Sequence, residues 1–348
     1  MQSITGPGVW TGVELGTKEA IVFELGARHL AELDANLKLV RDRGMKTESI
    51  KRKDFPLHAI ADELSACSAD LHNGRGLLIV RGFPIDQYSL ADLETLYWGF
   101  GAHLGVAVSQ SVMGDKLGHV IDVTDSDPHA RAYRNRQELT LHTDFSDIVS
   151  FLCVRKAKLG GLSWFASALA VHNEIQRTRP DLLAVLYRGF YWHRFSEEGA
   201  DATPITPWRV PVFSCCSDKV SCRFIRGYIT EAAAHESIEA LTDVEVEALD
   251  YFEEIAHRDD MPIKFMMEPG EAVFINNFTA LHARESFENY PEMDRRRLLL
   301  RLWMTVPAGR PIVPEVQIYD SGRAGGVPPQ LGRTPSYARK AEADTFPN

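Results

Sequence analysis

Hydrophobic positions in the first 105 residues recur at the spacings of both helices and strands. In the segment 27–44, apolar residues return at steps of three and four, which predicts an amphipathic helix. A second helix is predicted over 58–71, and a third from Ser89, a residue type that caps helix N-termini, to about residue 99. The apolar run 77–80 lies between them and predicts a short strand. The N-terminal part is therefore expected to be α/β.

From about residue 139 the pattern changes to short segments of alternating polarity. Turn signals such as Gly160-Gly161 separate several of them, and many short strands with such turns indicate an antiparallel sandwich or barrel. Two helices, over 166–177 and 242–257, are expected to interrupt the strands. The expected strands are 139–144, 148–154, 190–195, 210–214, 220–229, 263–267, 272–276 and 296–306.

The chain is expected to form one domain over residues 1–348. Its length fits one large barrel as well as two units of roughly 150 residues, but we find no internal repeat. The α/β part, residues 1–105, is interpreted as packing on a β-rich core over 106–306 that includes the helical insertions. Residues 307–348 are rich in Gly, Pro and Arg and are expected to be an irregular tail.

The composition argues against several classes of protein. Apolar residues make up 45% of the chain and charged residues 25%, which is ordinary for a soluble globular protein. The net charge of −10 argues against a nucleic-acid partner, because phosphate backbones need clustered positive charge. No apolar run approaches about 18 residues, so no membrane span is expected. Neither a nucleic-acid nor a membrane partner is therefore expected, and a homo-oligomer is possible.

The cysteines indicate a reducing compartment. There are five, an odd number, without a CxxC pair, and the start of the chain shows no signal-peptide pattern, so we expect a cytoplasmic protein. Cys215, Cys216 and Cys222 could be imagined as a zinc cluster. Adjacent residues of a strand point to opposite faces, however, so buried thiols are the better interpretation.

Two of three histidine–acid pairs are poor metal sites. On a helix, residues two apart point about 200° apart and cannot share one ion, which excludes His172 with Glu174 in the predicted helix 166–177. His257 and Asp259 lie where a charged helix is expected to end. A cation favoured at a helix C-terminus is sufficient to explain that histidine.

The third pair, His142 and Asp144, is a better candidate. In the predicted strand 139–144, Leu139, Leu141 and Thr143 are expected to share one face, while the histidine and the carboxylate share the other. A strand therefore aims both side chains at one point.

A third ligand is available downstream. His282 follows the predicted strand 272–276, and two histidines with one carboxylate form the facial triad of non-haem Fe(II) oxygenases. The alternative for His282 is a surface histidine in a polar loop.

The last predicted strand indicates an interior cation. From residue 297 to 304, the even positions are all apolar and should pack against helices. The odd positions include Arg297 and Arg301 together with Leu299 and Trp303, so this face is interpreted as pointing into the barrel. A buried arginine is costly unless it meets an anion, and it pairs well with a carboxylate. This implies a carboxylate ligand beside the candidate metal, whereas an exposed face with two solvated arginines is the alternative.

These candidate residues, in their order along the chain, resemble those of the taurine-dioxygenase-like Fe(II)/2-oxoglutarate-dependent dioxygenases. The likeness extends over about 76–304 and implies a mixed α/β, mainly β fold: a double-stranded β-helix (jelly roll, cupin-like) with flanking helices. The matching segments are His142-Thr143-Asp144, Gly160-Gly161-Leu162-Ser163, Asn276-Asn277 with His282, and Arg297 with Arg301.

The resemblance implies the cofactor and the reaction. His142, Asp144 and His282 would be the ligands of Fe(II). Enzymes of this kind use O2 to convert the co-substrate 2-oxoglutarate into succinate and CO2, and they oxidise a C–H bond of a second, small substrate. Hydroxylation is the usual outcome, while desaturation and ring closure use the same chemistry. Halogenases of the family lack the carboxylate ligand, so Asp144 argues against halogenation.

The resemblance also assigns the anion-binding residues. Arg297 would bind the far carboxylate of 2-oxoglutarate, and the Ser163 hydroxyl would contact the same group. Arg301 would contact a carboxylate of the substrate. The spacing from His282 also allows Arg295 or Arg296 as the co-substrate arginine, but strand parity favours Arg297 over Arg296.

Two other functions use the same residues. A zinc hydrolase can be built on two histidines and one carboxylate, but it gives Arg297 no role. A non-catalytic, cupin-like binding module is the third possibility, and the intact triad argues against it. The sequence does not identify the substrate. Further candidate pocket residues are Tyr133, Arg136, Arg194, Tyr228 and Arg284.

Overall fold

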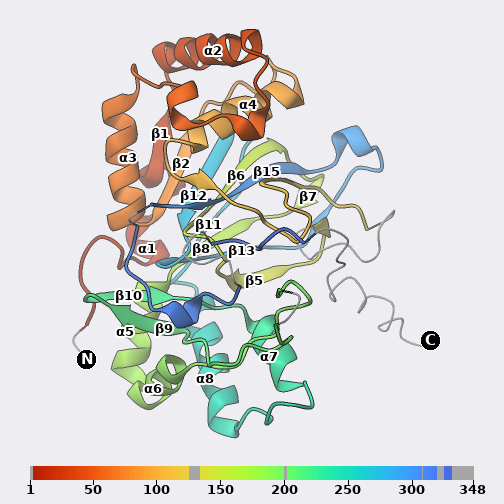
Figure 1. The fold of residues 1–348 in the computed structure, drawn as a ribbon. Coiled ribbons are helices and arrows are strands. Elements are labelled where there is room, and N and C mark those ends of the chain that lie inside the picture. Colours follow the sequence, from red (N-terminus) through yellow and green to blue (C-terminus); the bar gives the residue numbers. More distant parts are fainter. Residues whose placement is uncertain (1–2, 125–133, 200–201, 308, 320–324, 331–348) are drawn as a thin grey trace.

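Two β-sheets lie at the centre of the molecule, and helices cover their outer sides (Figure 1). The computed structural model describes residues 3–124, 134–199, 202–307, 309–319 and 325–330. The arrangement is the mixed, sheet-rich double-stranded β-helix that the sequence predicts, with an α/β N-terminal part.

The larger sheet joins strands from both ends of the chain. Its order is β1-β2-β12-β6-β15-β3, with β4 also paired to β15, and its pairs are antiparallel except β1 with β2. The sheet therefore extends the barrel strands with strands of the N-terminal part. Their bounds are β1 Val22–Glu24, β2 Leu77–Arg81, β3 Val106–Ala107, β4 Leu117–Val120, β6 Ile148–Arg155, β12 Glu271–Asn276 and β15 Leu298–Thr305.

The smaller sheet has the order β11-β8-β13-β5 and is antiparallel throughout. Two short antiparallel pairs, β9 with β10 and β7 with β14, lie outside the two main sheets. The bounds are β5 Leu139–His142, β7 Leu159–Gly160, β8 Ser163–Ser167, β9 Phe213–Cys216, β10 Lys219–Cys222, β11 Ile263–Phe265, β13 Ala280–Arg284 and β14 Phe287–Glu288.

The helices form two groups on opposite sides of the sheets (Figure 1). Helices α2 to α4 lie against the larger sheet, and α5 to α8 lie on the far side of the smaller one. Their ends follow the sequence: Ser89 caps α4, and Thr242 with Glu245 forms a capping box at α8. The bounds are α1 Gly12–Leu15, α2 Ala27–Asp42, α3 Ala61–Asn73, α4 Leu90–Gly101, α5 Ala168–Thr178, α6 Pro180–Arg188, α7 Arg226–Ala233 and α8 Asp243–His257.

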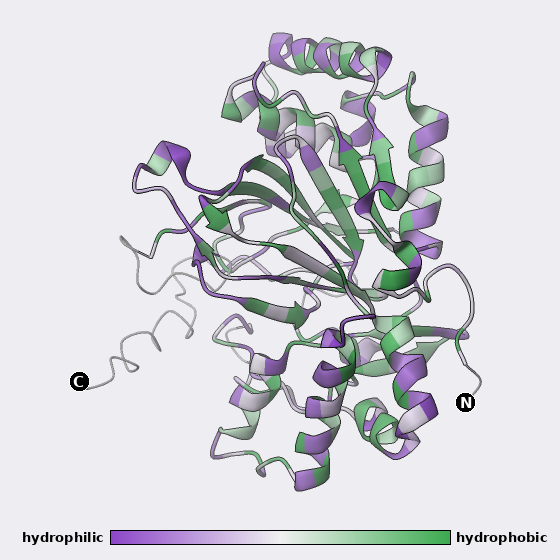
Figure 2. Ribbon diagram, turned by 180° about the vertical axis from the view of Figure 1, so that it is seen from behind, coloured by the Kyte–Doolittle hydropathy of each residue, from purple (hydrophilic) through white to green (hydrophobic). Residues whose placement is uncertain are grey.

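Strand β15 separates two hydrophobic cores. Its even positions, among them Leu298 and Leu300, belong to the core that the larger sheet shares with the N-terminal helices. Leu299 and Trp303 belong to the other core, between the sheets. The predicted parity of this strand is therefore confirmed. Figure 2 shows the strands mostly hydrophobic and the outer helices of mixed character, as this layering requires.

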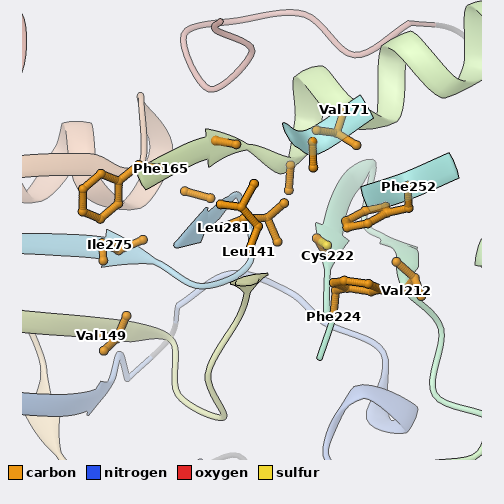
Figure 3. Close-up of a cluster of buried hydrophobic side chains, with 14 of the residues drawn as sticks. Leu141, Val149, Phe165, Val171, Val212, Cys222, Phe224, Phe252, Ile275 and Leu281 are labelled. Carbon is orange, nitrogen blue, oxygen red and sulfur yellow. The ribbon is translucent and has the colours of Figure 1, made fainter. Parts of the chain in front are cut away.

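The second core continues through the smaller sheet to the helices behind it. Leu141 of β5 and Leu281 of β13 lie side by side in Figure 3, with Phe252 of α8 and Phe224 nearby. These contacts fix β5 and β13 from the side opposite the cavity described below. The packing therefore sets the positions of the two strands that carry the candidate metal ligands.

The structure differs from the expected elements after residue 180. The segment 220–229 is not one strand, because β10 ends at Cys222 and α7 begins at Arg226. Arg226 forms ion pairs with Asp250 and Glu253 of α8, so tertiary contacts stabilise a helix that includes β-branched residues. In 190–195 only isolated bridges form, at Phe190 and His193, and Pro180–Arg188 is a helix that the pattern did not reveal.

All five cysteines are free thiols, but they are not all buried. Cys222 is buried as expected, and Cys153 is also buried, whereas Cys215 is exposed and Cys216 only partly buried on β9. The interpretation of Cys215 as a buried thiol was therefore wrong. The β9–β10 pair lies outside the two central sheets, which leaves one side of β9 open to solvent. Within the described residues, no helix has the length and apolar character needed to cross a membrane.

Candidate active site

The first two predicted ligands lie at the end of β5. His142 is the last residue of the strand, and Asp144 lies two residues beyond it in the following loop. The predicted alternation holds for Leu141 but not for Leu139, which lines the cavity beside His142. A register shift in the pairing with β13 sets Arg284 opposite Leu139, and such a β-bulge turns side chains to the other face.

The third ligand comes from the neighbouring strand. His282 lies on β13, is 6% exposed and pairs directly with His142 in the sheet, so it is not a surface histidine in a loop. Its Nε2 lies 3.5 Å from Asp144 Oδ2, and His142 Nε2 lies 4.0 Å from Asp144 Oδ1. One ligand atom from each side chain falls within 4.8 Å of the others, which makes this the single three-residue cluster of possible metal ligands in the described part of the chain.

Hydrogen bonds fix the orientation of the two ligands from β5. The carbonyl of Thr140 accepts a hydrogen bond from His142 Nδ1, at 2.7 Å, which leaves Nε2 directed at the site. The indole Nε1 of Trp303 donates to Asp144 Oδ2 at 3.0 Å. Partners of this kind set the tautomer and the rotamer of metal ligands. His142 and Asp144 are thus preorganised by contacts to β5 itself and to β15.

The backbone of Asp144 is held from both sides. Its N–H donates to Asn277 Oδ1 at 3.1 Å, and its carbonyl accepts a hydrogen bond from the buried guanidinium of Arg223. Asn277 also donates to the carbonyl of Ser146, at 3.1 Å, and so ties the loop after β5 to the end of β12. The position of the carboxylate therefore depends on residues from three separate segments.

Burial and charge set the protonation states that a metal requires. Burial, together with the charge of His282, lowers the pKa of His142 to about 4, so its imidazole is neutral at neutral pH. Burial alone would raise the pKa of Asp144, but the hydrogen bond and charge of His282 and the charge of Arg301 outweigh it and hold the pKa well below its usual range. A neutral imidazole and an ionised carboxylate are the forms that bind metals.

A cavity opens between the two sheets beside the triad. It spans about 540 Å³ of space not filled by atoms, including space open to solvent, and the triad side chains lie on its wall. Both sheets contribute, with β5, β8 and β13 on one side and β6, β12 and β15 on the other. Its polar lining residues are His142, Asp144, Ser163, His282, Arg284, Arg297 and Arg301. The structure thus brings all the predicted site residues together.

Arg297 is a buried cation in this cavity. It is 6% exposed, and among the described residues its Nη1 has no hydrogen-bond partner. Burial lowers its pKa to about 10, since its guanidinium lies away from water. Gly161 lies beside it, and a Cβ there would be in ordinary van der Waals contact, 3.5 Å from Arg297 Nε. It is the φ of +80° at this position that favours glycine. This is the environment of a residue that receives an anion.

The neighbouring arginine has a different role. Arg296 is also buried, but its guanidinium donates to the carbonyl oxygens of Asp122 and Pro291, and it does not line the cavity. The alternation along β15 explains the difference, because adjacent residues point to opposite sides. The geometry therefore favours Arg297 over Arg296 as the cavity arginine, as parity predicts.

Ser163 lies on the opposite wall from Arg297. It is the first residue of β8, is 6% exposed and lines the cavity. If its hydroxyl and Arg297 both hydrogen-bond the far carboxylate of 2-oxoglutarate, Ser163→Ala removes one neutral donor, worth about 0.5–1.5 kcal/mol of binding free energy. We expect the variant to need roughly 2- to 13-fold more 2-oxoglutarate for half-maximal turnover. Succinate formation against co-substrate concentration measures this, and Ser163→Thr is the control that retains the hydroxyl.

Arg301 lies four residues further along β15. It is 4% exposed, its Nε donates to Gln110 Oε1 at 2.5 Å, and its guanidinium carbon lies 5.0 Å from the centre of the Trp303 ring. Gln110 in turn donates to the Arg301 carbonyl at 2.9 Å. Arg301 is therefore a fixed cation close to Asp144, on the metal side of the cavity.

Sequence reasoning did not identify several residues that hold the site. Parity predicts Trp303 on the inward face with Arg301, but its hydrogen bond to Asp144 was not predicted. Asn277 lies in one of the segments that carry the resemblance, but its contact with Asp144 was not predicted. Gln110 and Arg223 carry no sequence signal, because their contacts depend on the packing of distant segments.

Of the further pocket candidates, Arg284 lines the cavity, whereas Arg136, Arg194 and Tyr228 are not among its lining residues. Tyr133 lies outside the described residues.

The histidines of the two excluded histidine–acid pairs form hydrogen bonds away from the cavity. His172 lies on α5 with its Nε2 3.0 Å from the hydroxyl of Tyr187. His257, in the last turn of α8, hydrogen-bonds through Nδ1 to the carbonyl of Glu253 at 2.8 Å.

Comparison with known families decides the class of protein. The model of the family described as "Taurine catabolism dioxygenase TauD, TfdA family" matches residues 41–303, most of the chain. The chain belongs to this family. It is therefore an Fe(II)/2-oxoglutarate-dependent oxygenase, and this membership favours the oxygenase over the zinc hydrolase and the non-catalytic module.

Two curated relatives match most of the chain at below 30% identity. The FR-33289 synthase of Streptomyces rubellomurinus is 29% identical over 313 residues, which cover 88% of this chain and 91% of the relative. The taurine hydroxylase-like protein SAT17 of Stachybotrys chartarum is 26% identical over 305 residues, covering 84% of this chain and 77% of the relative.

Solved structures of the family share the fold at low identity. An asparagine oxygenase, AsnO, superposes with a TM-score of 0.60 at 15% identity, over 83% of this chain and 99% of the other. The non-haem iron oxygenase OrfP gives a TM-score of 0.60 at 14% identity, over 82% of this chain and 94% of the other. At these identities the likeness establishes the fold and not the substrate.

Proposed function

We propose that the enzyme hydroxylates a C–H bond of a small carboxylate-bearing molecule, with conversion of 2-oxoglutarate and O2 into succinate and CO2. The observation that carries this proposal is the buried Arg297 guanidinium in the same cavity as the triad. The proposed roles are Fe(II) ligation by His142, Asp144 and His282, co-substrate binding by Ser163 and Arg297, and substrate binding by Arg301.

The residues of the triad fit Fe(II). Two imidazoles and one carboxylate, grouped on one side of a cavity, would hold Fe(II) as a facial triad, an arrangement that leaves positions open for co-substrate and O2. When bound, the iron supplies the oxidising chemistry. The protein supplies orientation through Thr140 and Trp303, and the apolar residues Phe151, Phe165 and Leu299 limit access of water to the cavity.

The fixed arginines divide the cavity into two anion sites. Arg297 immediately precedes β15 and Arg301 lies four residues further along, a backbone separation of roughly 13 Å at about 3.3 Å per residue. This separation is too great for Arg297 and Arg301 to bind the same carboxylate. We therefore assign Arg297 to the co-substrate and Arg301 to an anionic group of the substrate.

The names of relatives support an acidic substrate. Two solved neighbours are described with hydroxyasparagine and hydroxyarginine, both amino acids with a carboxylate, and one curated relative is named taurine hydroxylase-like. Hydroxylation is the outcome that these names share, which favours it over desaturation or cyclisation.

Succinate formation tests the function directly. The Fe(II)-loaded enzyme is incubated with 2-oxoglutarate, O2 and a panel of small acids, and we expect some acids to raise succinate above the uncoupled background. Zn(II)-loaded enzyme is the control, and it should form no succinate. Hydrolysis of esters or amides by the Zn(II) form, without succinate formation by the Fe(II) form, would instead establish the zinc hydrolase.

The charge of the substrate gives a separate prediction for Arg301. For any acid that triggers succinate formation, the methyl ester or amide should need a roughly 10- to 150-fold higher concentration for half-maximal turnover. The reason is that a charge-assisted hydrogen bond contributes about 1.5–3 kcal/mol to binding. In Arg301→Gln, acid and ester should become nearly equal. Neutral derivatives that work as well as the acids in the unmodified enzyme would show that Arg301 is structural.

We also propose that the chain acts in the cytoplasm and forms one oxygenase domain. Five free thiols suit a reducing compartment. Strands β1 and β2 extend the sheet that carries β6, β12 and β15, which supports a single folding unit.

A further inference from the structure

A second arginine lies beside the proposed co-substrate site. Arg284 is the last residue of β13, two positions after His282, so both side chains point to the cavity side of the strand. In the sheet it pairs directly with Ser163 of β8. Directly opposed residues of an antiparallel pair lie on the same face with their Cβ atoms about 5 Å apart. The register therefore places a cation next to the serine hydroxyl.

Arg284 and Arg297 approach each other around one aromatic ring. The guanidinium carbon of Arg284 lies 4.7 Å from the centre of the Phe287 ring, and that of Arg297 lies 5.1 Å from it. Both arginines are 6% exposed and line the same cavity. Phe287 pairs with Gly160, and Gly161, the next residue, lies beside Arg297, so the ring is fixed at this end of the barrel.

The two charges repel each other. Burial, and then the charge of Arg297, lowers the pKa of Arg284 to about 9, while Asp122 acts in the opposite direction. Among the described residues, no carboxylate forms an ion pair with either arginine. Two buried cations in one cavity are unfavourable until an anion enters between them. The cavity therefore has a stronger requirement for an anion than Arg297 alone would create.

The donors of Arg284 are only partly used. Its Nη1 donates to the carbonyl of Asn135 at 3.0 Å, and its Nη2 donates to the carbonyl of Gln137. These bonds fix the plane of the guanidinium. Its Nε is buried and has no hydrogen-bond partner among the described residues. An N–H donor therefore remains available on a side chain that cannot swing away.

We propose that Arg284 is a further binding residue for 2-oxoglutarate, and that its guanidinium, that of Arg297 and the Ser163 hydroxyl surround the far carboxylate together. This inference rests on the proposed function of the cavity. It adds a second positive charge to the co-substrate site, so the enzyme should discriminate strongly between 2-oxo acids with and without a far carboxylate. The bonds to Asn135 and Gln137 additionally order the segment that leads into β5.

Two 2-oxo acids distinguish a binding role of Arg284 from a purely structural one. 2-Oxopentanoate has the same chain length as 2-oxoglutarate but carries a methyl group in place of the far carboxylate. Calorimetric titration of the anaerobic Fe(II)-loaded protein with each acid gives two dissociation constants. In Arg284→Gln we expect 2-oxoglutarate binding to weaken by roughly 10- to 150-fold, and 2-oxopentanoate binding to change by less than about 2-fold.

Two further variants complete the experiment. Arg284→Lys keeps the charge and should recover part of the lost 2-oxoglutarate affinity. Arg296→Gln removes a neighbouring buried arginine that does not line the cavity, so the ratio of the two dissociation constants should stay unchanged. If Arg284→Gln does not fold, the ratio is measured in Arg284→Lys, where a shift towards 2-oxopentanoate is expected because one amine replaces the planar donor set.

The failure of this proposal is distinct from failure of the proposed function. Equal losses for the two acids in Arg284→Gln, or no loss for either, would overturn the role of Arg284 while the unmodified enzyme still prefers 2-oxoglutarate. An unmodified enzyme that binds both acids equally would instead overturn the assignment of the whole cavity to 2-oxoglutarate.

Discussion

Asp144→Ala is expected to abolish Fe(II)-dependent succinate formation while the protein stays folded. The carboxylate is the only acidic member of the cluster whose ligand atoms lie within 4.8 Å, so its loss removes one of three ligands and the charge that neutralises the metal. Replacing residues that merely support a metal ligand costs about 10- to 100-fold in affinity, and loss of a ligand should exceed that. His142→Ala and His282→Ala should behave in the same way.

The fold should survive because the backbone of Asp144 is held independently of its side chain. Its N–H and its carbonyl are bonded to Asn277 and Arg223, and neither bond involves the carboxylate. Circular dichroism and thermal melting check this, and anaerobic titration with Fe(II) measures the lost affinity. His257→Ala is the matched control, since that histidine is hydrogen-bonded at the end of α8. Fe(II) affinity and turnover that persist in a variant would remove its residue from the ligand set.

The sequence predicted the inward face of β15 because both sides of the strand have a distinct composition. Leucines and a methionine at every second position require burial against helices, and this leaves Arg297 and Arg301 on the inner side. Parity is a local property, so it can be found without knowledge of the partner strands. The same argument distinguished Arg297 from Arg296.

The predicted alternation of β5 places His142 and Asp144 on the cavity side, as the structure has them, but it was wrong for Leu139. Alternation assumes an unbroken strand, and the bulge opposite Arg284 depends on the pairing with β13, nearly 140 residues away in the sequence. The helix at Arg226 has a similar origin, since α8 supplies its ion pairs. Contacts between distant segments also create the support of Asp144 by Trp303, and no local pattern encodes them.

Arg297→Ala is expected to raise the 2-oxoglutarate requirement by roughly 10- to 150-fold. The side chain is 6% exposed, and a charge-assisted, bidentate pair with a carboxylate contributes about 1.5–3 kcal/mol, at about 1.4 kcal/mol per decade. Half-saturation by 2-oxoglutarate in the succinate assay measures the change, while Fe(II) affinity should stay within about 2-fold because Arg297 does not contact the triad.

The matched control for this prediction is Arg296→Leu, one residue earlier on the chain. Arg296 donates to the carbonyls of Asp122 and Pro291, so its loss should lower the melting temperature and leave the co-substrate requirement nearly unchanged. Arg297→Lys should lie between the unmodified enzyme and Arg297→Ala, because an ammonium keeps the charge but not the planar pair of donors. The opposite pattern, with near-normal 2-oxoglutarate affinity in Arg297→Ala and a large loss in Arg296→Leu, would mean that the strand presents its other face to the co-substrate.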